Sequence, residues 1–256
     1  MMRSYLLVVL LSFLFSLSTT ASTLTGPDLT EQEIKAILRK NEPTVILPFT
    51  FAGLSQDPLK GFLYKNKWAM PLLYEKPIVR NDYGFYYSEI LKKFDYDVGR
   101  KQLSLILKDN VYFSDGRKLV LEDLVWGLKR AAYLKPDLYV SSAIEGLADW
   151  HSQKNPLSSL PSGIKKRSPD LLTISFSRPI ENPFNMLEIH LFDLLPHDCF
   201  DKSNGDLICQ NPPSLGNYLL LEKRENFLSF GLWRKKEHLP KKINYLFIPP
   251  GGESQS

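Results

Sequence analysis

Residues 107–130, with the sequence LKDNVYFSDGRKLVLEDLVWGLKR, set the order of secondary structure in this chain. Just before them, residues 101–107 alternate between polar and apolar side chains, which is the pattern of a strand with one buried face. Asp115 and Gly116 predict a tight turn, because glycine tolerates the positive φ that such turns need. Beyond the turn, apolar residues recur every three or four positions from Leu121 to Ala132, which predicts an amphipathic helix.

The predicted helix also carries four charged residues, Glu122, Asp123, Lys129 and Arg130. The acids stand near its beginning and the bases near its end, an order that suits the helix dipole. We therefore expect these side chains to form a charged, solvated face opposite the apolar face that packs in the core.

The rest of the chain mixes helical and strand patterns. Thr30 and Glu33 form a capping-box pair, which predicts a short helix ending near Asn41. Residues 43–49 are mainly apolar and predict a buried strand. We expect further helices at 68–74 and 184–195, strands at 171–176, 218–222, 227–233 and 243–248, and an exposed loop at 155–169. The sequence thus predicts a mixed α/β protein.

Composition excludes several classes of protein. The chain has 256 residues, of which 43% are hydrophobic and 23% charged, so it has enough apolar side chains to form a core and is not wholly disordered. Its net charge is +4 and is spread along the sequence, whereas a nucleic-acid-binding protein usually has a clustered basic face. Eighteen prolines and fourteen glycines argue against an all-helical bundle.

The first 21 residues have the pattern of a secretory signal peptide. Arg3 precedes an apolar core at 6–17, and small residues follow, with a cleavage site after Ala21. The apolar core is shorter than the roughly 20 residues of a transmembrane helix, which disfavours the alternative of an uncleaved membrane anchor. No cysteine stands at the cleavage site, so we do not expect a lipoprotein. The sequence predicts an exported, periplasmic protein.

Two cysteines, Cys199 and Cys209, lie ten positions apart around a turn-rich stretch. In an exported protein such a pair is expected to form a disulfide. The alternative is a metal site that includes His197, but no fourth ligand and no Cys-x-x-Cys spacing accompany it. We therefore predict a disulfide and no metal.

The motifs in this order resemble one family, the family 5 extracellular solute-binding proteins of ABC importers for oligopeptides, dipeptides and nickel. Residues 107–119 resemble the signature L-[RK]-x-x-[VA]-x-[FW]-x-D-G-x-x-[LV], and 122–130 resemble the helix E-D-[VLF]-V-[FWY]-x-[LW]-x-R. Shorter segments agree at 56–58, 73–79, 163–176, 215–218 and 232–249. One departure is Val120-Leu121, where the family has Thr-Ala. Without the threonine cap, we expect packing to hold the helix start.

The resemblance implies a periplasmic-binding-protein type II lobe with a mixed sheet and a smaller inserted α+β domain. It covers 43–250, about the first half of the family's length, so we expect the C-terminal lobe to be absent. The incomplete first lobe would comprise residues 22–75 and 172–250. The inserted domain would span 76–171, and 251–256 would be a frayed tail.

The resemblance also implies ATP-driven import of a peptide or other small solute, with docking on an ABC permease in the membrane. It implies no catalytic residue and no cofactor. By position in the family, the residues that would face the ligand are Gly61, Phe62, Gly216, Asn217 and Tyr218.

Three hypotheses remain open for the function. The chain is a truncated solute-binding protein, or a half-length binding module that needs a second chain for the missing lobe, or an exported enzyme. The last is the weakest, because the sequence contains neither G-x-S-x-G nor H-E-x-x-H, and its four histidines have no serine or cysteine motif around them.

Overall fold

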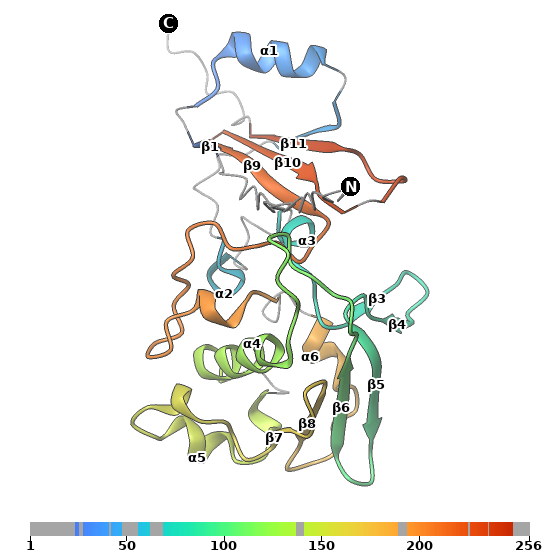
Figure 1. Cartoon of the computed structure of the whole chain (residues 1–256), viewed down its shortest axis with the longest axis vertical. Helices are drawn as coiled ribbons and strands as arrows, with labels where there is room; N and C mark the ends of the chain where they lie inside the picture. The colour runs from blue at the N-terminus through green and yellow to red at the C-terminus, as the bar shows by residue number, and fades with distance from the viewer. Residues whose placement is uncertain are drawn as a thin grey trace, which may run out of the picture.

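The computed structural model describes residues 24–25, 28–40, 42–47, 56–61, 69–136, 141–188, 194–224, 226–234 and 236–247. The predicted signal peptide and C-terminal tail lie outside these residues. Figure 1 shows a five-stranded sheet at one end of the molecule and a four-stranded sheet toward the other. Both sheets combine with helices, so the mixed α/β class is confirmed.

The five-stranded sheet has the order β1 (Leu24–Thr25), β9 (Tyr218–Arg224), β10 (Phe227–Leu232), β11 (Lys242–Phe247) and β2 (Thr44–Leu47). The three central strands are antiparallel, as expected for strands joined by short connections, and the two outer strands pair in parallel with their neighbours. Segments almost 200 residues apart in sequence thus share one sheet.

A helix covers each side of this sheet (Figure 1). On one side is α1 (Glu31–Arg39), whose Ile34 and Ile37 pack against a small cluster of Leu29, Phe227 and Leu246. The capping box is confirmed, because the Thr30 hydroxyl accepts from the Glu33 N–H and the Glu33 carboxylate accepts from the Thr30 N–H. On the other side is α3 (Met70–Leu73), which contacts β9.

Strand β2 is more exposed than the sequence predicted. The strand itself is confirmed, but its burial is not: Val45 and Ile46 are 40% and 51% exposed, and only Leu47 is buried. The reason is position, since β2 is the last strand in the order of the sheet. An apolar run does not distinguish an edge strand from a central one.

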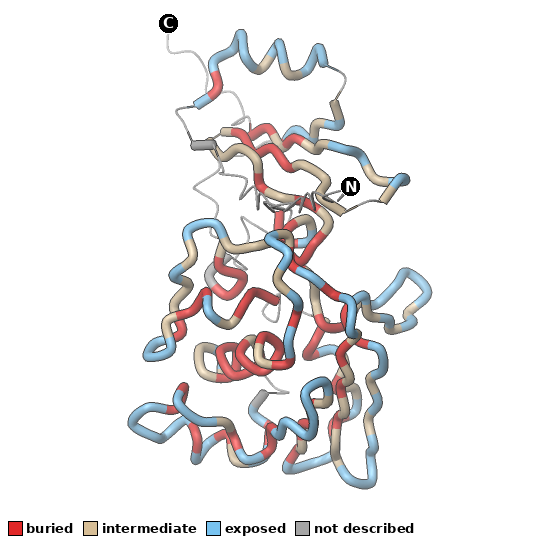
Figure 2. The backbone as a smooth tube through the Cα atoms, in the orientation of Figure 1, coloured by how far each residue is buried: buried red, intermediate tan, exposed pale blue. Residues whose placement is uncertain are grey.

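The four-stranded sheet is antiparallel, in the order β5 (Leu91–Asp97), β6 (Gln102–Leu107), β8 (Leu171–Ser175) and β7 (Ile164–Lys166). In β6, buried and partly exposed residues alternate as predicted. A small hairpin of β3 (Val79–Arg80) and β4 (Tyr86–Tyr87) stands beside β5 (Figure 1). The long helix α4 (Leu121–Leu134) packs on this sheet, and Figure 2 shows it buried over most of its length.

The turn and helix start next to the signature segment follow the sequence with one difference. Gly116 has a φ of +87°, as its turn requires. At the start of α4, the Val120 N–H donates to Asp123 Oδ2 at 2.9 Å. The packing expected at this helix start is present, since Leu121 and Leu124 are buried, and the carboxylate of Asp123 adds a hydrogen bond from a backbone donor that a threonine cap would not reach.

Short elements complete the fold. They are α2 (Pro58–Gly61), α5 (Leu147–His151), α6 (Phe184–Glu188) and the 3-10 turns Ser141–Ala143, Pro156–Ser158 and His197–Cys199. Two expectations were wrong here. The stretch 155–169 is not simply an exposed loop, since Pro156 and Leu157 are buried and β7 lies within it. The helix predicted at 184–195 ends earlier, because 194–195 have no helical structure.

None of the helices in the described ranges is both long enough and apolar enough to cross a membrane.

Candidate functional site

The turn at residues 214–218 packs directly on the end of α3. The Ser214 hydroxyl lies within hydrogen-bond distance of the carbonyls of Leu73 and Tyr218 and shares its one proton between them, and the Gly216 N–H donates to the Leu73 carbonyl at 2.9 Å. A Cβ atom on Gly216 would lie 2.4 Å from the carbonyl oxygen of Leu72. Glycine is therefore required at this position by the close approach of two backbones, and Gly216 has a structural role.

Tyr218 and Trp233 close the other side of the same turn. Tyr218 is 2% exposed and its hydroxyl donates to the Pro240 carbonyl at 3.0 Å. Burial raises the pKa of this hydroxyl above its usual range. The Trp233 indole N–H donates to the Gly216 carbonyl at 2.7 Å, and the Trp233 backbone N–H donates to the Asn217 carbonyl at 3.1 Å. These bonds hold the turn in one conformation.

Asn217 differs from its neighbours in the turn, because its side-chain oxygen accepts no hydrogen bond from the described residues. Oδ1 is buried and has no hydrogen-bond partner among the described residues. A buried acceptor without a donor costs free energy, and such atoms are uncommon in folded proteins. Among the ligand-facing candidates that the structure describes, Asn217 is the one with a buried side-chain atom that has no hydrogen-bond partner.

Of the other two candidates, only Gly61 lies within the described residues, at the end of a helix that begins beside a buried ion pair. Gly61 is the last residue of α2, and Phe62 lies outside the described residues. At the start of α2, the Asp57 carboxylate contacts Arg130 of α4 at 2.5 Å, and the two side chains are 5% and 3% exposed. The Tyr74 hydroxyl, just after α3, donates to the Gln56 carbonyl at 2.7 Å. The region of α2 is thus fixed to both α3 and α4.

The bases of α4 contradict the solvated charged face that the sequence predicted. The Arg130 guanidinium also donates to the Gly205 carbonyl and lies 4.6 Å from the centroid of Phe200. The Lys129 ammonium lies 4.1 Å from the Trp126 ring and donates to the Leu157 carbonyl at 2.8 Å, and burial lowers its pKa. Both cations are buried because aromatic faces and carbonyls replace water around them.

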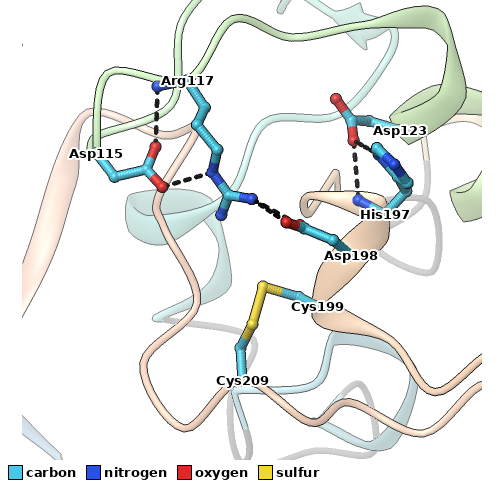
Figure 3. Close-up of a disulfide and its surroundings, with 7 residues drawn as sticks. All are labelled: Asp115, Arg117, Asp123, His197, Asp198, Cys199 and Cys209. Carbon is cyan, nitrogen blue, oxygen red and sulfur yellow. Dashed lines mark hydrogen bonds and ion pairs between the residues drawn. A yellow bond between two sulfur atoms is a disulfide. The ribbon is translucent and has the colours of Figure 1, made fainter.

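Asp123 of α4 is also buried and connects the helix to the segment around the cysteines (Figure 3). Its Oδ1 accepts from the backbone N–H of His197 at 2.8 Å and lies 2.7 Å from Nδ1 of the same residue. Of the four charged residues that were expected to face water, only Glu122 is partly exposed. Its carboxylate pairs with the Lys166 ammonium at 2.6 Å.

The disulfide lies beside this contact. Cys199 and Cys209 are bonded, with 2.10 Å between their sulfur atoms. Arg117, next to the Asp115-Gly116 turn, pairs with Asp115 and with Asp198, each at 2.6 Å (Figure 3). The segment around the disulfide is thus held to residues 115–123 by the Arg117–Asp198 ion pair and by the hydrogen bonds between Asp123 and His197. His197 serves the Asp123 contact, and in the described part of the chain no group of His, Cys, Asp and Glu is arranged to hold a metal ion.

Comparison with known proteins identifies the fold. No family model matches the sequence, and no curated protein is similar to it in sequence. Solved structures do match. OppA of Haemophilus influenzae, in complex with the peptide RPPGFSPFR, matches with a TM-score of 0.65 at 16% identity, over 81% of this chain and 42% of that one. The chain has the fold of an ABC-transporter substrate-binding protein.

Two further solved structures agree with this fold. The murein tripeptide binding protein MppA of Escherichia coli has a TM-score of 0.66 at 18% identity, over 81% of this chain and 42% of MppA. NikA of Brucella suis, in complex with Fe(III)-EDTA, has a TM-score of 0.63 at 13% identity, over 82% and 40% of the two chains. The present chain spans about 40% of the length of these substrate-binding proteins. The fold expected from the sequence motifs is confirmed.

Sequence reasoning missed the buried charges of this region. Arg130 was predicted to lie on a solvated face, and Asp57 belongs to one of the shorter segments that resemble the family. No local pattern reveals that they form a pair, because they are 73 positions apart. One signal in the sequence pointed to Arg130. The helix pattern that residues 122–130 resemble ends in arginine at this position, which favours a structural role over a solvated one.

Proposed function

We propose that this chain is the solute-binding-protein-like component of an ABC import system for a peptide or similar small solute, and that it is not an enzyme. The observation that supports this proposal is the fold, which over 81% of the chain resembles OppA in complex with a peptide. The proposal includes export to the periplasm after signal cleavage near Ala21. One of the similar structures, MppA, is described as periplasmic.

In this proposal the turn at 214–218 is part of the wall of the ligand cleft. Asn217 Oδ1 accepts a hydrogen bond from an amide N–H of the solute, which would satisfy the buried oxygen. Gly216 and Tyr218 hold the turn against α3 and β10, and the end of α2, with Gly61 and Phe62, forms the adjoining wall. A peptide ligand suits such a wall because it offers several amide donors.

A second wall is needed for tight binding. Small-molecule sites usually bury most of their ligand, which a wall on one side does not achieve. We propose that the second wall comes from outside the described residues, either from another part of the same protein or from a second chain, and that the closed form docks on a membrane permease. If neither source supplies a second wall, the remaining hypothesis is a truncated solute-binding protein, which would bind its solute only weakly.

Binding of defined ligands tests the proposal. The fluorescently labelled peptide RPPGFSPFR is titrated with the purified chain and followed by anisotropy, and a tripeptide and a nickel chelate are tested as competitors. We expect weak but saturable binding by one of these classes. The variant Asn217→Ala should lower the affinity about 3- to 10-fold, since a single hydrogen bond contributes about 0.5–1.5 kcal/mol.

The matched control is Asn110→Ala, at an exposed asparagine in the turn before the signature segment, which should leave the affinity unchanged. Equal affinity of the two variants would contradict the role of Asn217 while leaving the solute-binding role in place. Absence of saturable binding by every ligand class, in a chain that melts cooperatively, would contradict solute binding itself.

A further inference from the structure

The two edge strands of the four-stranded sheet differ in how well they are protected. β7 has only three residues, two of them lysines, whereas β5 has seven residues and no proline. In the described part of the chain, no backbone–backbone hydrogen bond joins residues 92–97 to a segment other than β6. β5 stands at the outer side of the molecule (Figure 1). A strand edge of this length is a template for pairing with another strand.

The side chains of β5 alternate between the two faces of the sheet. Phe94 and Tyr96 lie opposite buried leucines of β6, and the Phe94 ring packs in the interior against Phe184 at a centroid distance of 5.3 Å. Lys93 and Asp95 point to the other face and are exposed. The tripeptide 93–95 therefore has a cation and a carboxylate on the outer face, with an aromatic ring between them on the inner face.

This tripeptide is complementary to a second copy of itself. In an antiparallel pair, residues directly opposite each other lie on the same face of the sheet. A two-fold axis at Phe94 would place Lys93 opposite Asp95 of the second copy, and Asp95 opposite Lys93 of the second copy. Two opposite-charge pairs then form on the outer face, while the two Phe94 rings meet on the inner face.

Other strands fit this edge less well. The pairing of β5 with β6 shifts between Leu91 and Lys93, which makes Lys92 a bulge residue and bends the strand at that point. Lysines and bulges on an edge strand discourage pairing with strands in general. Parallel pairing in register would set each charge against a like charge. A carboxylate two residues after the lysine, in an antiparallel partner, removes the repulsion, and β5 itself has that spacing.

We propose that β5 is a dimerisation edge, at which two copies of the chain pair antiparallel about a two-fold axis at Phe94 and join their four-stranded sheets into one. Each copy uses the same surface, so the contact closes after two copies and does not extend into a fibre. Because the regular pairing is short, the dimer is weak. β5 lies in a different sheet from β9 and the turn at 214–218, so the dimer does not depend on the proposed solute cleft.

Charge reversal tests the pairing. Self-association of the purified chain is measured by sedimentation velocity over about a hundredfold range of concentration, because dimerisation follows mass action. Lys93→Glu and Asp95→Lys each turn two attractive contacts into two like-charge contacts, so each should weaken the dimer at least about tenfold. The double variant restores opposite charges and should recover the dimer. An equimolar mixture of the two single variants should also dimerise, since each supplies the charge that the other has lost.

The matched controls are Lys154→Glu and Asp149→Lys, which make the same charge changes at exposed positions in and after α5. They should leave self-association unchanged. All four single variants change exposed side chains, so their melting temperatures should stay close to that of the parent chain. The proposal is overturned if the parent chain stays monomeric at every concentration, if the reversals in β5 act no more strongly than the controls, or if the mixture does not dimerise.

A cysteine at the axis tests the register. Directly opposite Cα atoms in an antiparallel pair are about 4.5–5.5 Å apart, which lies within the range of a disulfide. The two native cysteines are bonded to each other. Under mild oxidation, Phe94→Cys should therefore give a disulfide-linked dimer, whereas Tyr96→Cys, on the same face but away from the axis, should not. Failure of Phe94→Cys to cross-link, or equal cross-linking of both variants, would contradict the two-fold register. The outcome of the peptide titration has no bearing on these results.

Discussion

Replacing Arg130 with methionine removes the cation from the buried pair with Asp57. The side chains of the pair are 3% and 5% exposed and are 2.5 Å apart. Methionine has about the length of the arginine stem, so the packing against Phe200 is largely kept. The variant therefore tests the charge and its hydrogen bonds, including the one to the Gly205 carbonyl, and creates little cavity.

The expected loss of stability is about 3–5 kcal/mol, the typical cost of removing one partner from a buried ion pair. Much of this cost arises because the Asp57 carboxylate stays buried without the guanidinium. For a domain of this size, each kcal/mol lowers the melting temperature by about 2–4 °C, so the shift should be about 6–20 °C. The double variant Asp57→Leu with Arg130→Met should recover most of the loss, because no uncompensated charge is left in the core.

Urea unfolding, followed by tryptophan fluorescence and far-ultraviolet circular dichroism, measures both variants. The control is Arg100→Met, at an arginine that pairs with Asp97 at 3.5 Å and has a side chain 81% exposed. An exposed pair contributes at most about 1 kcal/mol. If Arg130→Met costs no more than this control, or if the double variant is less stable than the single one, the pair is not the buried clamp that the structure shows.

Three further predictions concern the candidate site and its surroundings. Gly216→Ala should destabilise the chain by at least about 2 kcal/mol in urea unfolding, because its Cβ would contact backbone atoms of α3, whereas Gly99→Ala meets its nearest atom at 3.4 Å and should be nearly neutral. Burial raises the pKa of Tyr218 above its usual 10.0, so Tyr218 ionises first in the unfolded chain, and the free energy of unfolding falls as the pH rises past that value. Between about pH 8 and about pH 11, the variant Tyr218→Phe should therefore lose less stability than the parent chain. An equal loss in the two proteins would refute the role of Tyr218. Replacing both Cys199 and Cys209 with serine should lower the free energy of unfolding by about 2–3 kcal/mol. If a reducing agent leaves the stability of the parent chain unchanged, the disulfide does not contribute to it.

The sequence predicted best those elements whose cause is local. The strand–turn–helix order of residues 101–134 depends on alternation, on a glycine with positive φ and on helical spacing, and all three act within a few residues. The capping box at Thr30 and the strands β9, β10 and β11 belong to the same class. Local patterns of this kind do not depend on the rest of the fold.

The errors have the opposite cause, because burial depends on partners that are distant in sequence. Strand β2 was expected to be buried, but the order of the sheet places it last and exposes Val45 and Ile46. Lys129 and Arg130 were expected to face water, but carbonyls and aromatic rings from other segments surround them. The amphipathic pattern of α4 gave the right helix and the wrong environment for its polar residues.

The buried charges of α4 also bear on how a binding wall keeps its shape. Arg130 joins α4 to Asp57 at the start of α2 and to Gly205 in the disulfide-bonded segment, so one side chain connects three segments far apart in sequence. A wall that is held in its bound conformation before the solute arrives does not lose entropy in ordering itself, and its contacts then appear as affinity. If α2 belongs to the cleft, Arg130→Met should therefore weaken peptide binding even at a temperature where the variant is fully folded. Unchanged affinity in that variant would show that the Arg130–Asp57 pair stabilises the fold without contributing to the binding site.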